Sequence, residues 1–226
     1  QEYYCSFTGM IEGSYYSRSL ELAESEGRIT NVPHETTVEV ETAWDLGVGD
    51  STAIWFIQRV GKEIRFIDYY ETTGEGLPFY VKVLREKSYT YGRHYAPHDI
   101  MVRELGTGKS RYETAQKLGI DFDVVPRLSV DDGIDACRNM LTRCWFDKEK
   151  VKKGLSSLWQ YHKEVDEKAG EYEGRVTFKN KPHHDWSSHG ADSFRTYAVG
   201  RKGIDKASRA PEFYDVGAGE QSWMAM

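Results

Sequence analysis

Hydrophobic residues change their spacing several times along the chain, and each change predicts a new element. β-branched and aromatic residues dominate three runs, 38–45, 52–60 and 64–70. Glycine-containing turns at 47–49 and 61–63 join these runs. Short turns between runs of this kind are typical of antiparallel strands. The pattern therefore predicts a three-stranded antiparallel meander.

Beyond residue 78, helical spacing alternates with short apolar runs. A fourth strand that ends at Asp99 and a fifth at 121–125 are predicted, with a hairpin-like excursion at 170–182. The predicted helices are 79–87, 112–118, one capped by Ser129, one from Val151 to Val165, and 185–199. This order predicts an α/β fold with a mixed sheet flanked by helices. The first strand is expected in the middle of the sheet, beside the fourth.

Residues 1–37 and 201–226 differ in pattern from the region between them. A helix-compatible run ends at Gly27, and a linker-like segment follows it. We therefore expect a helical prelude at 1–37, a main domain at 38–200 and a polar tail at 201–226. Because the chain begins with Gln1, a fragment or processed product is expected.

Composition limits the class of protein. The 226 residues include 39% hydrophobic ones, which fits a folded domain, and no run is long enough to span a membrane. Cys5, Cys137 and Cys144 lack metal-ligand spacing and are interpreted as core residues in a reduced, intracellular setting. The net charge of -6 is unusual for a nucleic-acid-binding protein. Bound cations would offset clustered carboxylates, and a local basic strip would still hold DNA.

Asp45 lies inside the first predicted strand. Burying a carboxylate without a partner is costly, so Asp45 is expected to face a cation or a carboxylate that shares one. The candidate partners are Asp99, at the end of the fourth strand, and Asp192, on the last helix. Three acids from separate elements predict a site for Mg²⁺ or Mn²⁺, because these ions prefer oxygen ligands. Two such ions would activate a water and stabilise the departing oxygen of a phosphodiester.

Further residues border this predicted site. Asp185, His189 and Asp192 are spaced four and three apart, so they are expected to share one helix face. His189 is interpreted as orienting an acid, with a buried core histidine as the alternative. Asp50 either approaches a second metal ion or only forms the turn after the first strand. Taken singly, Asp185 is equally well read as a helix cap, Asp99 as a turn residue and Asp192 as a surface charge.

The segment Gly106–Ser110 looks like a phosphate-binding loop. It lacks the first glycine of that motif, because the position holds Arg103, and nucleotide binding is therefore not expected. In this region Lys109 and Arg111 are predicted to touch DNA phosphates. The second predicted basic group lies before the last helix and consists of Arg175, Lys179 and Lys181. A third group is better interpreted as solvated surface: Lys148, Lys150, Lys152 and Lys153.

Four segments together resemble a known family. They are Ala43–Ala53, Pro97–Asp99, Arg103–Ser110 and His189–Arg195. In this order they resemble the C-terminal nuclease domain of the large terminase subunit of tailed bacteriophages, over about residues 40–200. The resemblance implies a ribonuclease H-like fold and a metal-dependent endonuclease that cuts concatemeric viral DNA during genome packaging.

The resemblance also implies roles and partners. Asp45, Asp99 and Asp192 take the places of the three metal-binding acids, with His189 and Asp50 as accessory residues. The implied partners are double-stranded DNA and, in a full-length protein, an upstream ATPase domain, the small terminase subunit and the portal. The place of action would be the procapsid in the host cytoplasm. Residues 2–7 resemble the segment that leaves the ATPase, whose Walker motifs have no match here.

Two other kinds of function stay open at this stage. Another ribonuclease H-like enzyme, such as a junction resolvase or transposase, would cut specific structures or transfer strands. A non-catalytic module that docks DNA or portal would bind without cutting. A nucleotide-binding module is the weakest alternative, because it depends on the incomplete motif at Gly106–Ser110.

Overall fold

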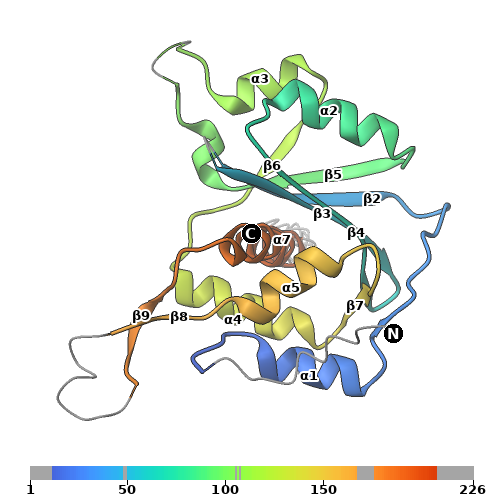
Figure 1. The fold of residues 1–226 in the computed structure, drawn as a ribbon. Coiled ribbons are helices and arrows are strands. Elements are labelled where there is room, and N and C mark those ends of the chain that lie inside the picture. The colour runs from blue at the N-terminus through green and yellow to red at the C-terminus, as the bar shows by residue number, and fades with distance from the viewer. Residues whose placement is uncertain (1–11, 48–49, 105, 107, 167–175, 208–226) are drawn as a thin grey trace, which may run out of the picture.

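A mixed β-sheet forms the centre of the protein (Figure 1). The computed structural model describes residues 12–47, 50–104, 106, 108–166 and 176–207, without the side chains of 202–207. In order across the sheet, the strands are β1 (Ile29–Thr30), β7 (Cys144–Asp147), β4 (Glu63–Thr73), β3 (Ser51–Val60), β2 (Val40–Leu46), β5 (Tyr91–Ala96) and β6 (Phe122–Val124). β3 pairs antiparallel with β2 and β4, and the other pairings are parallel.

The predicted meander and its helix-linked strands are confirmed. β2, β3 and β4 are consecutive antiparallel neighbours, and β5 lies beside β2. The sheet nevertheless extends further than predicted, because β1 and β7 add two strands beyond β4. The middle position therefore belongs to β3, whereas β2 is an interior strand next to it. β1 and β7 have two and four residues, too few for a recognisable period.

Helices cover both faces of the sheet, as Figure 1 shows. One face packs on α2 (Leu77–Glu86) and α3 (Arg111–Lys117), and the other on α1 (Ser17–Ser25), α4 (Val130–Leu141), α5 (Lys152–Gln160) and α7 (Ser187–Ala207). Neighbouring residues of β2 divide between the layers, with Ala43 in the α7 layer and Trp44 in the α2 layer. Because side chains alternate along a strand, β2 is buried on both sides.

Several predicted boundaries shift because tertiary hydrogen bonds override the local pattern. The Ser129 cap is confirmed, since its hydroxyl accepts from the backbone of Asp132 at 3.1 Å. The helix predicted from Val151 to Val165 ends at Gln160, and Val165 belongs to β8 (Lys163–Val165). β8 pairs with β9 (Phe178–Pro182), which makes the excursion a hairpin with a different first strand.

The ends of the chain contribute to the fold more than their composition suggests. α1 contacts α4 and α5, and β1 joins the sheet. α7 begins at Ser187 instead of 185 and continues to Ala207 instead of 199, so part of the predicted tail is helical. The segment 2–7 and residues 208–226 lie outside the described residues.

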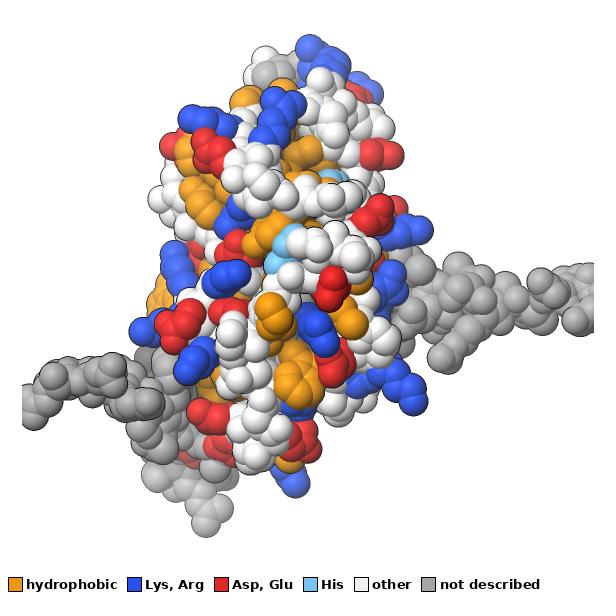
Figure 2. All heavy atoms as spheres, turned by 90° about the vertical axis from the view of Figure 1, so that its right-hand side faces the viewer, with side chains coloured by type: hydrophobic (Ala, Val, Ile, Leu, Met, Phe, Trp, Pro, Cys, Tyr) orange, Lys and Arg blue, Asp and Glu red, His pale blue; other side chains and the backbone are white. Residues whose placement is uncertain are grey.

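Charged side chains of both signs are interspersed on the face seen from the right-hand side of Figure 1 (Figure 2). This distribution agrees with a modest net charge of -6. Within the described residues, no helix has the length and apolar character to cross a membrane.

Candidate metal and nuclease site

Three predicted acids line one cavity. Asp45 comes from β2, Asp99 from the 3-10 turn η1 (His98–Met101) after β5, and Asp192 from α7. The cavity has a volume of about 210 Å³ and also includes Arg195 and Thr196 in its wall. Acids that are far apart in the sequence therefore meet at one end of the sheet, where the parallel strands β2 and β5 terminate.

The close approach of α7 to the sheet depends on Gly190. A Cβ atom at this position would lie 2.0 Å from Oγ of Ser157 and 2.9 Å from the hydroxyl of Tyr69. The backbone carbonyl of Gly190 accepts a hydrogen bond from Nε1 of Trp55 at 2.8 Å. These contacts hold α7 in place at Gly190, the residue next to His189, and so help to position the His189 imidazole.

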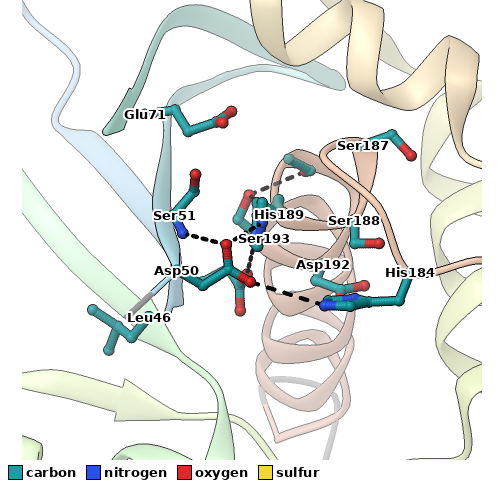
Figure 3. A network of polar contacts seen from close by, with 12 residues as sticks. Leu46, Asp50, Ser51, Glu71, His184, Ser187, Ser188, His189, Asp192 and Ser193 are labelled. Carbon is teal, nitrogen blue, oxygen red and sulfur yellow. Dashed lines mark hydrogen bonds and ion pairs between the residues drawn. The ribbon is translucent and has the colours of Figure 1, made fainter. Parts of the chain in front are cut away.

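His189 lies between two carboxylates. Its Nδ1 is 3.4 Å from Oδ2 of Asp45. On its other side, Nε2 is 3.1 Å from Oδ1 of Asp50, which Figure 3 shows beside the ring. The hydrogen bond to Asp45 raises the pKa of His189, against the opposing effect of burial. The ring therefore connects Asp45 near the end of β2 with Asp50 in the turn before β3.

Asp192 is anchored through one oxygen. Its Oδ1 lies 3.0 Å from Nη1 of Arg195 and accepts a hydrogen bond from the hydroxyl of Tyr161 at 3.3 Å. Burial raises the pKa of Asp192 to about 6, Arg195 opposes this rise, and the nearby charge of Asp45 adds to it. The neighbouring carboxylate of Asp45 favours a bound cation at this position, because a cation would relieve the repulsion between the two acids.

Asp99 is more open than Asp192. Its side chain is 52% exposed, and its Oδ2 lies 3.9 Å from Nη2 of Arg111. Arg111 is mostly buried and also donates to the carbonyl of Leu46 at the end of β2. The guanidinium therefore links the end of β2, next to Asp45, with the η1 turn that carries Asp99. The sequence had predicted only a DNA contact for Arg111.

Asp185 lies outside the helix on which the sequence placed it. Its carboxylate accepts hydrogen bonds from the backbone and the hydroxyl of Ser187, the first residue of α7. Its own backbone nitrogen donates to the hydroxyl of Ser188 at 3.2 Å. Asp185 lies two residues before the start of α7, so it does not share the predicted helix face with His189 and Asp192.

The predicted basic residues occupy different settings. Lys179 and Lys181 extend from β9 to Glu164 on β8, with 2.6 Å between Nζ of Lys181 and the carboxylate. Hydrogen bonds from both lysines lower the pKa of Glu164 to about 2. Lys109 is exposed, and Arg175 lies outside the described residues.

Glu71 is an acid near the site that the sequence pattern did not reveal. Its side chain is only 4% exposed and lies 3.0 Å from Nζ of Lys153, while the hydroxyl of Tyr69 donates to it. Ala53 is the register partner of both Asp45 and Glu71, so the two acids point to the same face of the sheet. Finding Glu71 would have required the strand register. The sequence analysis also missed Tyr161, which contacts Asp192. The contact between Asp192 and Arg195 was easier to foresee, because the two residues are three apart on one helix.

The donor set suits a hard divalent cation. Carboxylate oxygens are the ligands that Mg²⁺ and Mn²⁺ prefer, and Asp45, Asp99 and Asp192 supply them to one cavity. Among the described side chains, no group of three His, Cys, Asp or Glu residues is already close enough together to hold an ion.

Comparison with solved structures identifies the fold. The structure is similar to the nuclease domain of the phage P22 large terminase, with a TM-score of 0.58 and 14% identity, over 86% of this chain and 95% of that one. It is also similar to the large terminase nuclease domain of bacteriophage SPP1 with bound Mn, with a TM-score of 0.51 and 17% identity, over 73% and 86%. The chain has the fold of a large terminase nuclease domain. The predicted ribonuclease H-like architecture is thereby confirmed.

A longer protein shares this fold in part. The large terminase of a thermophilic bacteriophage matches with a TM-score of 0.55 and 15% identity, over 75% of this chain and 41% of that one. The chain therefore corresponds to less than half of that longer terminase. No protein-family model and no curated protein matches the sequence.

Proposed function

We propose that this protein is a metal-dependent endodeoxyribonuclease that cuts concatemeric viral DNA during genome packaging. The observation that carries the proposal is the meeting of Asp45, Asp99 and Asp192 on one cavity at the end of the sheet. The terminase-nuclease fold supports it, as does the bound Mn in the SPP1 domain.

Each side chain has a distinct task in this proposal. Asp45, Asp99 and Asp192 would hold Mg²⁺ or Mn²⁺, in two sites. Such ions, when bound, supply an activated water and stabilise charge on the departing oxygen. His189 fixes Asp45 relative to Asp50, while Arg111 holds Asp99 near the end of β2. Asp185 has an indirect part, since its carboxylate binds the backbone of Ser187 at the start of α7.

Double-stranded DNA is the proposed substrate, with Lys109, Arg111, Arg175, Lys179 and Lys181 as phosphate contacts. Within the whole terminase, the ATPase domain, the small terminase subunit and the portal are the proposed partners, at the procapsid in the host cytoplasm. The proposed catalytic region is 38–200, with 1–37 and 201–226 as flanking segments.

A supercoiled-plasmid assay with Mn²⁺ or Mg²⁺ tests the proposal directly. The parent protein should nick and linearise the plasmid, and chelation by EDTA should stop cutting. Asp45→Ala should abolish cutting almost completely, because that acid is shared by the whole site. Asp99→Ala and Asp192→Ala should also lose activity. Thermal unfolding of Asp99→Ala should stay close to that of the parent, because the Asp99 side chain is half-exposed.

The docking alternative predicts the opposite result. A docking module would show no calorimetric binding of Mn²⁺ or Mg²⁺, and Asp45→Asn would leave its DNA affinity unchanged. Cutting that continues in EDTA would also contradict the proposal. A preference for branched DNA over plain plasmid would favour the resolvase-like alternative.

A further inference from the structure

Tyr161 lies directly behind the acid on α7. It follows the last residue of α5, is only 2% exposed, and donates its hydroxyl to Oδ1 of Asp192 at 3.3 Å. Nη1 of Arg195 approaches the same oxygen at 3.0 Å and also donates to the Tyr161 hydroxyl at 3.3 Å. The three groups thus form a closed triangle at one side of the cavity wall.

A stack of tyrosines from the N-terminal segment holds the Tyr161 ring. The rings of Tyr16 and Tyr161 are stacked, with centroids 5.8 Å apart and an interplanar angle of 16°. The Tyr15 ring lies 5.2 Å from Tyr161, and its backbone nitrogen donates to the Tyr161 carbonyl at 3.0 Å. Tyr16 also lies 6.4 Å from the Phe194 ring on α7. Both the ring and the backbone of Tyr161 are therefore fixed.

We propose that Tyr161 is a positioning residue, which holds Oδ1 of Asp192 so that Oδ2 is presented to the shared cavity. A carboxylate that rotates freely must be ordered each time it binds a cation, and a fixed one has already lost that freedom. Arg195 shares the task, but its positive charge also repels a cation. Only the neutral hydroxyl of Tyr161 contributes orientation without a charge.

This inference rests on the proposed function, because Asp192 must be a cation ligand for its orientation to matter. A charge-neutral substitution separates orientation from electrostatics. Tyr161→Phe removes the hydroxyl and leaves the Arg195–Asp192 ion pair in place. Tyr16→Phe is the matched control, since it removes the hydroxyl of the stacked neighbour and leaves both Asp192 contacts unchanged.

The experiment measures Mn²⁺ affinity by isothermal titration calorimetry on the metal-free protein, with plasmid cutting followed separately. Tyr161→Phe should bind Mn²⁺ about tenfold more weakly, the lower end of the usual effect for residues that orient ligands. Its thermal unfolding and that of Tyr16→Phe should match the parent, and Tyr16→Phe should keep the parent affinity. Arg195→Lys, which keeps the charge and shortens the reach, should also weaken binding.

Three outcomes would overturn the inference. Parent-like Mn²⁺ affinity in Tyr161→Phe would remove the positioning role and leave the proposed nuclease intact. Equal weakening in Tyr16→Phe would assign the effect to packing of the stack. A parent protein that binds no Mn²⁺ and cuts no DNA would remove the proposed function and the inference with it. Should Tyr161→Phe fail to fold, Tyr161→Met, which also removes the hydroxyl, takes its place in the same comparison with the same outcomes.

Discussion

Asp45 and Glu71 project from the same face of the central sheet, in the row that contains Ala53. Two strand spacings separate their backbones, a distance of about 10 Å. Glu71 is buried, and Lys153 reaches it from α5. Glu71 thus adds negative potential near the proposed cation site, while Lys153 offsets part of it.

Neutral substitutions of Glu71 and of Lys153 should therefore change cation affinity in opposite directions. At about 10 Å, a unit charge contributes on the order of 1–2 kcal/mol at an effective dielectric constant of about 20. Because Lys153 offsets part of this, Glu71→Gln should weaken Mn²⁺ binding by about two- to fivefold. Lys153→Gln should strengthen it by a similar factor. Calorimetry measures both, with Lys152→Gln as the control, and a shift of both variants in one direction would contradict this account.

Removal of the His189 imidazole should impair cutting without unfolding the protein. His189→Gln loses one of the contacts to Asp45 and Asp50, and residues that orient ligands typically contribute about 10–100-fold. We expect a loss of that size in the plasmid-nicking rate. Asp50→Ala should be milder than Asp45→Ala, because Asp50 is half-exposed and lies at the turn. A parent-like nicking rate for His189→Gln would assign that residue to the core.

Gly190→Ala should destabilise the fold. Its new methyl group would meet the buried Ser157 side chain, and overpacking of this kind costs about 1–3 kcal/mol. Urea unfolding measures the loss, and Ser157→Gly in the same chain should recover part of it. Gly76→Ala is the control, because its Cβ has a contact no closer than 3.6 Å. Equal losses at positions 76 and 190 would contradict the close-approach argument.

The sequence predicted the site best where one element carries its own pattern. Asp45 inside an apolar strand and Asp192 in a helical run were recognisable because local spacing shows them. Glu71 was not, since its closeness to Asp45 depends on a register across three strands. Asp185 was placed inside the helix instead of before it, because composition alone does not separate a cap from the first turn.

Tertiary contacts explain the other failures. β1 and β7 are short strands that only their pairing defines. Tyr161 reaches Asp192 across a separation of 31 residues, and no local pattern encodes that meeting. Local chemistry predicts elements, and packing between elements decides which of their polar residues meet.

His94 should make stability depend on pH. Nε1 of Trp44 donates to the Thr42 hydroxyl at 2.7 Å, and that hydroxyl lies 2.6 Å from Nδ1 of His94. When Nδ1 of His94 is unprotonated, it accepts a hydrogen bond from this hydroxyl. Burial lowers the pKa of His94 to about 4.

The sign follows from the unfolded state. An unfolded histidine has a pKa of about 6.5, so it binds protons more readily than folded His94. Stability is complete above pH 6.5 and is lost as the pH falls from there toward 4. Between pH 8 and pH 5 the loss should reach no more than about 2 kcal/mol. Urea unfolding at both pH values should show a smaller pH effect in His94→Gln, and identical pH effects would contradict the assignment.

The segment before β2 is needed for the fold, because Arg28 binds two backbone carbonyls elsewhere in the chain. Its guanidinium donates to the carbonyls of Leu141 and Cys144, at 2.8 and 2.7 Å, and so completes the junction between α4 and β7. A chain that starts at residue 38 would leave these carbonyls without their hydrogen-bond donor, and the β7 edge without its partner β1. It would also lack Tyr15 and Tyr16, which pack against Tyr161. Such a fragment should self-associate in size-exclusion chromatography, so the proposed catalytic region 38–200 needs the flanking residues from Ser14 onward for a stable fold.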